Sequence, residues 1–125
     1  TNNLVSGSAM VTGGTGSVMG APVISNNTMT VALTGVANAQ TITVSLSNVT
    51  DEFGETLPGI SVNMGMLAAD TNGNRSVNSG DVAQTKSRIG QALSGANFRS
   101  DVNANGGINS ADVANVKSNI GSALP

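Results

Sequence analysis

The side chains that could do chemistry in this chain are concentrated in two short stretches. In residues 70–81, oxygen-bearing side chains stand at positions one, three, five, nine and twelve, with a hydrophobic residue at position eight. Residues 101–112 repeat the pattern without insertion or deletion. This is the spacing by which a twelve-residue loop wraps its oxygens around Ca²⁺ before a helix begins. The sequence therefore predicts two calcium sites.

A different interpretation of each stretch is a run of Asx-rich turns that binds no metal. A single copy would leave that alternative open. Two copies in the same phase, thirty-one residues apart, favour the calcium loops. Four of the seven carboxylates of the chain (Asp70, Asp81, Asp101 and Asp112) lie in these stretches and account for the acidic balance.

Each loop is followed by a segment with the apolar spacing of a helix. The apolar-stripe positions fall at i, i+3 and i+7, and they are Val82, Thr85 and Ile89 in the first copy and Val113, Val116 and Ile120 in the second. We expect Ser79 and Ser110 to cap the start of each helix, and Gly90 and Gly121 to end them.

The stretch between the two repeats allows only a short helix or a turn. No long entering helix precedes either loop, unlike an ordinary EF-hand. Leu93 and Phe98 lie in the connecting stretch, and we expect them to cover the apolar stripes of the two helices. Residues 68–125 are therefore predicted to form a small all-α unit of two loop–helix repeats.

Residues 1–67 carry the pattern of an all-β unit. Residues 29–34, 41–46 and 60–64 alternate apolar with polar side chains, which is typical of half-buried antiparallel strands. Turn-forming residues separate them. We expect five or six short strands in a small, reduced β-sandwich. The stretch 46–57, with a strand, Val-Thr-Asp, Gly and Leu, resembles a turn of bacterial immunoglobulin-like repeats, which implies an Ig-like module.

Composition excludes several classes of function. The chain has no cysteine and no histidine, which leaves out disulfides, thiolate or imidazole metal sites and Ser-His catalysis. The net charge of −2 provides no basic surface for nucleic acid. Asp51, Glu52 and Glu55 form the one carboxylate cluster outside the loops, and a solvated turn is favoured over glycosidase chemistry. We expect no catalytic site and no membrane span, and we expect a piece cut from a longer secreted bacterial protein.

The repeats resemble the dockerin family, whose loops read Asp-x-Asn-x-Asp-Gly-x-Ile-Asn-x-x-Asp, followed by a hydrophobic residue and by Lys at position seventeen. The residues that match are Asp70, Asn72, Asn74, Val77, Asn78, Asp81, Val82 and Lys86, and then Asp101, Asn103, Asn105, Gly106, Ile108, Asn109, Asp112, Val113 and Lys117. The resemblance covers about 55 residues. Position five is Asn in both loops, where the family commonly has Asp. Position six of the first loop is Arg75, where Gly normally makes the turn.

The resemblance implies two calcium ions and a ligand set. Side-chain oxygens would come from positions one, three and five, a backbone carbonyl from position seven, a water-mediated contact from position nine and a bidentate carboxylate from position twelve. The implied ligands are Asp70, Asn72, Asn74, Ser76, Asn78 and Asp81 in the first loop, and Asp101, Asn103, Asn105, Gly107, Asn109 and Asp112 in the second. With two carboxylates per loop, and with Arg75 at the turn, we expect weaker affinity and a distorted first site.

The resemblance also implies a partner, a cohesin-like protein module. The family uses positions ten, eleven, seventeen and eighteen of each repeat. These positions are Ser79, Gly80, Lys86 and Ser87, and then Ser110, Ala111, Lys117 and Ser118. Several depart from the family's usual residues. The near-identity of the repeats implies binding in either of two orientations.

The sequence hypothesis is therefore a secreted or cell-surface protein–protein attachment module, in a monomeric bacterial chain and in a setting such as polysaccharide degradation. Calcium folds it, a cohesin-like receptor binds it, and the β unit is a spacer or stabiliser. The alternative is a structural calcium-stabilised C-terminal module with no cohesin partner, in which the two lysines belong to a solvated helix face.

Overall fold

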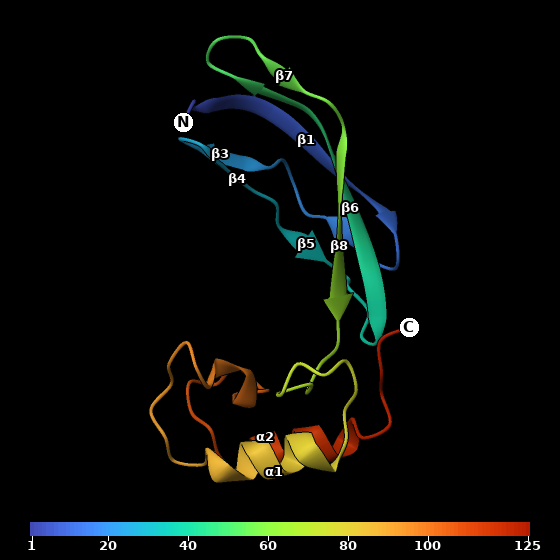
Figure 1. Ribbon diagram of the computed structural model, residues 1–125, viewed down its shortest axis with the longest axis vertical. Coiled ribbons are helices and arrows are strands. Elements are labelled where there is room, and N and C mark those ends of the chain that lie inside the picture. The colour runs from blue at the N-terminus through green and yellow to red at the C-terminus, as the bar shows by residue number, and fades with distance from the viewer. The chain divides into compact units, whose positions relative to one another are not determined.

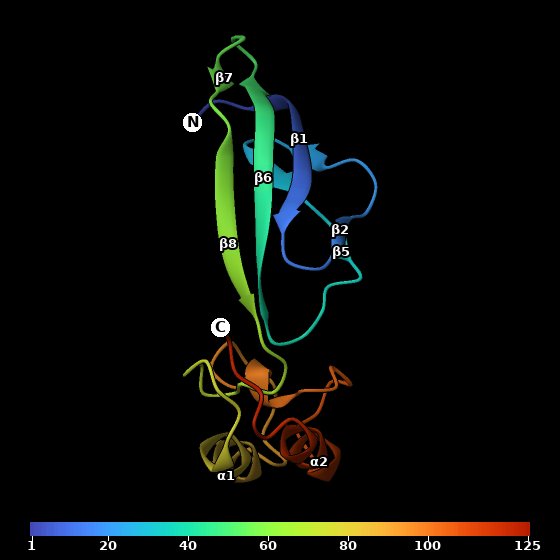
Figure 2. The same cartoon turned by 90° about the vertical axis from the view of Figure 1, so that its right-hand side faces the viewer.

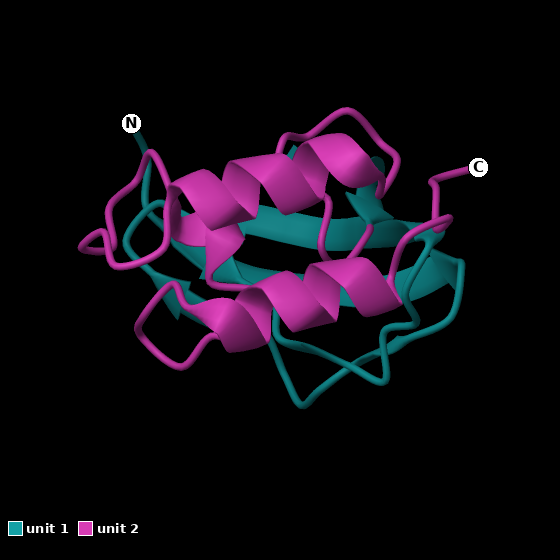
Figure 3. Ribbon diagram, turned by 90° about the horizontal axis from the view of Figure 1, so that it is seen from below, with its two compact units in different colours: residues 1–66 teal, residues 67–125 magenta.

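The computed structural model describes residues 1–125 and divides into two compact units, Thr1–Met66 and Leu67–Pro125 (Figure 3). The first unit contains all the strands, and the second contains the helices. Each unit is described separately below. No helix in the structure has the length and apolar character needed to cross a membrane.

The β unit is built around one long strand, β6 (Gln40–Asp51). Strand β1 (Leu4–Gly13) pairs with one side of it, and β8 (Ile60–Met66) and the short β7 (Thr56–Leu57) pair with the other. All these pairs are antiparallel, and Figures 1 and 2 show the strands side by side.

Alternation along β6 gives the sheet one apolar and one hydroxyl face. Ile42 and Val44 are 0% and 5% exposed. On the other face, Ser45 Oγ lies 2.8 Å from both Thr12 Oγ1 on β1 and Ser61 Oγ on β8. The predicted strands at residues 41–46 and 60–64 therefore lie within β6 and β8. The predicted half-buried alternation holds along β6, whereas Ile60 and Val62 of β8 are exposed because β8 is an outer strand of the sheet.

Two small ribbons accompany the sheet. Strand β2 (Ser17–Val18) pairs with β5 (Leu33–Thr34), and β3 (Val23–Ser25) pairs with β4 (Thr28–Thr30). The single strand predicted at residues 29–34 is wrong, because the chain leaves the β3 ribbon after Thr30 and joins the β2 ribbon at Leu33. The β-rich character of the unit agrees with the prediction, and its Ig-like identity stays a prediction.

The second unit contains helix α1 (Ser79–Ser87), the short 3₁₀ helix η1 (Phe98–Ser100) and helix α2 (Ser110–Ser118). Helices α1 and α2 lie side by side (Figures 2 and 3). The centre of the unit is a small apolar cluster to which loops and helices contribute: Ala69, Val77 and Val116 at its core, with Leu67, Val82 and Val102 packed against it.

The helix boundaries differ slightly from the prediction. The N-caps are Asn78 and Asn109, one residue before the expected serines. The Asn78 Oδ1 accepts a hydrogen bond from Gly80 N at 2.7 Å, and its twin Asn109 accepts one from Ala111 N at 2.8 Å. The asparagine side chain is longer than that of serine, so its amide oxygen reaches the first free N–H groups of the helix from the position before the serine. The last helical residues are Ser87 and Ser118, so Gly90 and Gly121 follow the helices at positive φ without terminating them directly.

The apolar stripes are shorter than predicted. Thr85 and Val116 are fully buried, but Ile89 and Ile120 are 47% and 53% exposed. Each isoleucine follows the end of its helix, where the spacing of 3.6 residues no longer applies.

The predicted cover by Leu93 and Phe98 is also wrong, because both side chains are exposed. The connecting stretch is organised instead around the buried Asn97. Its amide accepts from Ser94 N at 2.8 Å and donates to Ala92 O at 2.9 Å. These local hydrogen bonds direct the turn, so the larger apolar side chains point to solvent.

Candidate metal centre

The first carboxylate of each loop gathers the backbone around it. Asp70 Oδ1 accepts hydrogen bonds from Gly73 N and Asn74 N at 2.9 and 3.1 Å, and its Oδ2 accepts one from Arg75 N at 2.9 Å. Successive N–H groups therefore converge on one anionic side chain, which bends residues 70–75 into a tight turn.

The second loop closes in the same way with fewer bonds. Asp101 Oδ1 accepts from Asn105 N at 3.1 Å, and its Oδ2 accepts from Gly106 N at 3.0 Å. These acceptors and donors occupy the same loop positions as Asp70, Asn74 and Arg75. The local geometry therefore follows the sequence repeat.

The asparagines at positions three and five continue each turn. In the first loop, Asn72 Oδ1 accepts from Asn74 N and Asn74 Oδ1 accepts from Ser76 N, both at 3.0 Å. In the second, Asn103 accepts from Asn105 N and Asn105 accepts from Gly107 N, both at 3.1 Å. Each amide oxygen thus bonds to the backbone N–H two residues later, which holds the side chain against its own loop.

The carboxylate at position twelve ties the loop to the helix. Asp81 and Asp112 are both fully buried. Asp81 Oδ1 accepts from Asn72 N at 3.2 Å, and its Oδ2 accepts from Asn78 N at 2.9 Å. Asp112 makes the equivalent bonds to Asn103 N at 3.2 Å and Asn109 N at 2.8 Å. One residue therefore links the beginning of the loop to the first turn of the helix.

Position nine is occupied by the helix cap in both repeats. The Oδ1 atom of each asparagine accepts from the helix N-terminus, and its Nδ2 donates toward position seven: to Ser76 Oγ at 3.1 Å from Asn78, and to Gly107 O at 3.2 Å from Asn109. Because the amide oxygen at position nine faces the helix N-terminus, a water-mediated contact suits this position better than direct ligation.

One contributor to the first loop was not anticipated from the sequence. Thr71 is 3% exposed, and its N–H donates to Asp81 Oδ1 at 3.0 Å, with its hydroxyl 3.4 Å from the same oxygen. The equivalent residue of the second loop is Val102. Comparison of the repeats could not reveal this role, because the two copies differ here.

The donor set of each loop fits a hard divalent cation. Each loop combines two carboxylates with amide oxygens. No three His, Cys, Asp or Glu side chains are placed so that they could hold a metal ion together, so amide and carbonyl oxygens would have to complete each site. The hydrogen-bond partners of the buried Asp81 carboxylate are backbone N–H groups and the Thr71 hydroxyl, none of which carries a charge. A buried carboxylate is costly without a compensating charge. Oxygen donors and two negative charges match Ca²⁺.

Backbone strain is distributed differently in the two loops. Arg75 at position six has φ of +73°, as its replacement of glycine led us to expect, and the equivalent Gly106 has φ of +91°. At position four the order is reversed, with Gly73 at +75° and Ala104 at +54°. Each loop therefore holds one side-chain-bearing residue in the left-handed region, at different positions.

The end of each helix is bonded to the loop of the other repeat. Gly90 N, after α1, donates to Ile108 O in the second loop at 2.9 Å. Gly121 N, after α2, donates to Val77 O in the first loop at 3.0 Å. Both acceptors are the hydrophobic position eight of their loops. The two repeats are thereby joined reciprocally.

The family model described as the dockerin type I domain matches residues 68–121. This match supports a dockerin module. Dockerin type I domains are non-catalytic modules that in general bind calcium and cohesin partners, and they typically occur in secreted or cell-surface proteins. No curated protein and no solved structure matches the chain.

The second unit exposes all the residues that were predicted to contact a partner. They share the surface around α1 and α2: Ser79, Gly80, Lys86, Ser87, Ser110, Ala111, Lys117 and Ser118. A groove of about 580 Å³ lies between the helices and brings the two lysines together with Ser79, Val82, Ala83 and Ile120. The sequence did not indicate that Val82 and Ile120 would line this groove.

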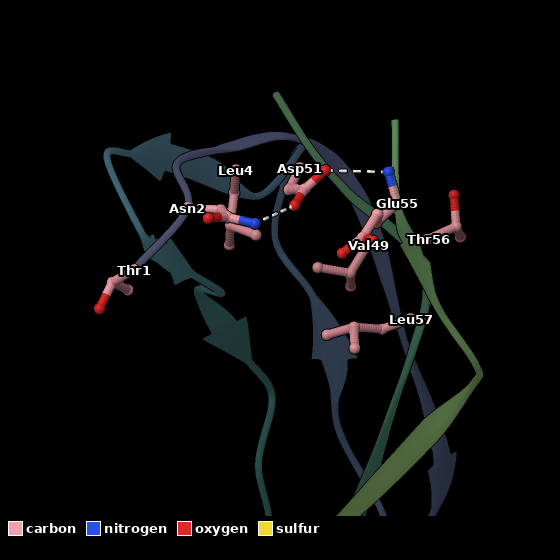
Figure 4. A pocket seen from close by; sticks show the side chains of 8 residues that line it. All are labelled: Thr1, Asn2, Leu4, Val49, Asp51, Glu55, Thr56 and Leu57. Carbon is pink, nitrogen blue, oxygen red and sulfur yellow. Dashed lines mark hydrogen bonds between the residues drawn. The ribbon is translucent and has the colours of Figure 1, made fainter. Parts of the chain in front are cut away.

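The carboxylate cluster of the β unit closes a turn. Asp51 Oδ1 accepts from Phe53 N and Glu55 N, both at 2.9 Å, and its Oδ2 accepts from Asn2 Nδ2 at 2.6 Å (Figure 4). The Asn2 hydrogen bond, followed by those of the turn, lowers the pKa of Asp51 against the opposing effect of burial. Because the pKa of Asp51 is lower in the folded chain than in the unfolded chain, the ionised carboxylate stabilises the fold at pH values above the unfolded pKa. This stabilisation is lost as the pH falls below about 4.

A hollow of about 740 Å³ lies beside this turn in the β unit. It is lined by Thr1, Asn2, Leu4, Val49, Asp51, Glu55, Thr56 and Leu57 (Figure 4). The oxygens of Asp51 are occupied by the bonds that shape the turn. The geometry is therefore that of a structural carboxylate. Glu52 and Glu55 are exposed, as a solvated turn requires, but Asp51 is buried.

Proposed function

We propose that residues 68–125 form a calcium-dependent attachment module for a cohesin-like protein, and that residues 1–67 act as its spacer or stabiliser. The observation that carries the proposal is the pair of loops whose position-twelve carboxylates are fully buried and bonded back to the loop start. The family match over the same residues supports it.

In this proposal each loop holds one Ca²⁺ through the six positions predicted above. The first, third, fifth and twelfth positions supply side-chain oxygens, and the seventh supplies its carbonyl. Bound calcium supplies the positive charge that compensates two carboxylates in each loop. The chain itself orients these groups, because backbone N–H groups fix the rotamers of Asp70, Asp81, Asp101 and Asp112.

The helix groove supports a partner of particular chemistry. Lys86 and Lys117 are exposed and flank the apolar Val82 and Ile120. Such a surface favours a partner that presents an apolar side chain bordered by carboxylates. The two lysines are at equivalent positions of the two repeats, so exchanging the repeats leaves this charge pattern unchanged. Binding in two orientations related by a half-turn follows from that equivalence.

The test is surface plasmon resonance of the full chain against a panel of purified cohesin modules, in calcium and after chelation. We expect the chain to bind a cohesin module when calcium is present and not after chelation. Lys86→Glu and Lys117→Glu would each weaken binding modestly, since the other orientation remains, whereas the double variant would lose it. Binding of the double variant at wild-type strength would refute the proposed face.

The structural alternative has its own outcome in the same experiment. Gly80 and Ala111 lack the hydroxyl that the family commonly has at position eleven, which is the observation that favours it. If no cohesin module binds while chelation still unfolds the helices, calcium stabilises a terminal module that has no cohesin partner.

A further inference from the structure

Strand β8 is an outer strand of the sheet. It pairs with β6 through seven consecutive residue pairs, from Leu46↔Ile60 to Gln40↔Met66, without a register shift. Its partner in the sheet is β6 alone. The backbone groups along its other edge are therefore available to a further strand, as at any regular sheet edge.

The opposite edge of the sheet, strand β1, is protected against the addition of another strand, whereas the β8 edge is not. Strand β1 has three register shifts against β6, and the ribbon strands β2, β3 and β4 lie against it. Leu4 N also donates to Asn26 O at 2.7 Å. Irregularity and cover of this kind prevent strand addition. Residues 56–69 contain no charged residue, and β8 contains no proline.

The side chains of β8 extend the two faces of the sheet to this open edge. Ile60 and Val62 are 53% and 43% exposed, and Val62 lies opposite the buried Val44 of β6. Ser61 and Asn63 lie on the hydroxyl face, where they bond to Ser45 and Thr43. A strand added here would need apolar residues on one face and small polar residues on the other.

We propose that β8 is the docking edge for a second copy of this chain, paired antiparallel about a two-fold axis at Val62. In that register Val62 lies opposite itself, Ile60 lies opposite Met64, and Ser61 lies opposite Asn63. Apolar residues meet apolar residues, and polar residues meet polar ones. The residue pattern of β8 is therefore complementary to that of a second, antiparallel copy of β8.

The distribution of charge selects the antiparallel arrangement. Three carboxylates, Asp51, Glu52 and Glu55, lie at the turn that precedes β8, and the β unit has no Lys or Arg. A parallel pair would bring the two acidic turns together at one end. The antiparallel pair places them at opposite ends and brings together only uncharged segments.

The antiparallel arrangement also sets where the dockerin modules begin. Each copy of β8 ends at Met66, immediately before the second unit. The two Met66 residues would lie at opposite ends of the paired strands. The association would therefore produce a bivalent particle with one attachment module leaving from each end.

The first test is sedimentation equilibrium of the full chain over a wide range of concentration. We expect a reversible monomer–dimer equilibrium that persists in chelator, because the proposed edge belongs to the β unit. Val62→Lys would place two like charges opposite each other and weaken association about tenfold. Val5→Lys is the matched control, since Val5 is 59% exposed on the protected edge strand β1. A monomer at all concentrations, a dimer lost with calcium, or equal effects of the two variants would overturn the proposal.

A second test keeps the register falsifiable if the lysine variant fails to fold. The chain has no cysteine, so Val62→Cys introduces a single thiol. Directly opposed residues in an antiparallel pair have Cα atoms about 4.5–5.5 Å apart, which is within disulfide reach. We expect rapid intermolecular disulfide formation under mild oxidation for Val62→Cys and little for Val5→Cys. Equal rates for the two variants would rule out the Val62-centred pairing.

Discussion

The two predicted calcium loops have the same spacing of oxygen-bearing residues, but their backbones make different hydrogen bonds to the loop carboxylates. The first loop gives Asp70 three backbone N–H donors and adds Thr71 to the buried Asp81. The second loop gives Asp101 two. Hydrogen bonds to an ionised acceptor are the stronger kind, so the first loop is more preorganised before any metal binds.

Backbone strain modifies that ranking. The first loop carries Arg75 at positive φ, and the second carries Ala104. From the sequence, only the arginine was apparent, and the first site was expected to be the weaker one. The structure shows that each loop has one such residue, so strain does not by itself make the first site inferior. Preorganisation and strain must be separated by experiment.

The largest expected effect is removal of calcium from both loops. We expect chelation to abolish most of the helical circular dichroism and to leave the β-unit signal in place, because metal binding supplies folding free energy to the helices. Helicity unchanged by chelator would contradict the metal assignment for both loops.

The second effect separates the loops. Asp81→Asn and Asp112→Asn each remove one charge from a fully buried group at the helix start. We expect each variant to lower the affinity of its own loop on the order of 100-fold, measured by isothermal titration calorimetry. One weakened and one near-normal binding event should appear in each variant. If both events weaken equally in one variant, the loops cannot be treated as separate sites.

A smaller effect compares the strained positions. Ala104→Gly relieves positive φ at position four and should stabilise the calcium-bound fold by up to about 1 kcal/mol in thermal unfolding. Arg75→Gly relieves the same kind of strain but also removes the bond from Arg75 Nη2 to Pro125 O at 3.0 Å, so its gain should be smaller. Gly106→Ala is the opposite control and should destabilise. A gain from Arg75→Gly that exceeds the gain from Ala104→Gly would restore the first loop as the more strained.

The smallest effect concerns the residue that distinguishes the loops at position two. Thr71→Val gives the first loop the valine of the second and removes a hydroxyl near the Asp81 carboxylate. We expect a loss of about 0.5 kcal/mol in unfolding free energy, at the low end for one hydrogen bond, because the hydroxyl lies 3.4 Å from the carboxylate oxygen. Val102→Thr is the reciprocal variant. No change in the first variant would show that the backbone N–H of Thr71 alone serves Asp81.

Much of the second unit could be predicted because its signals are local. The loop spacing and the following helices depend on residues within a few positions of each other, and both helices lie where the repeat indicated. The exposure of Ile89, Ile120, Leu93 and Phe98 could not be predicted in this way. Burial depends on which segment packs on a helix, and Ala69 and Val77, from before α1, occupy that place.

The β unit was predicted in its alternation but not in its pairing. Ile42 and Val44 are buried as period two requires. The division of residues 29–34 between two ribbons depends on two pairings: Thr30 pairs with Val23 in a tight hairpin, and Leu33 pairs with Val18, which lies farther back in the chain. Strand pairing is set by such long-range contacts, so a single sequence indicates strands better than it indicates their neighbours.

The reciprocal bonds of Gly90 and Gly121 mean that neither repeat is complete by itself. Each helix ends on the loop of its twin, so half of the module would lack the acceptor that fixes its own helix end. A chain cut near Gly95 should therefore give two fragments in which each helical repeat is unfolded by itself, while the β unit stays folded, and circular dichroism should show helix formation when the fragments are mixed with calcium. The internal duplication has therefore produced a single folding unit in which each repeat completes the other.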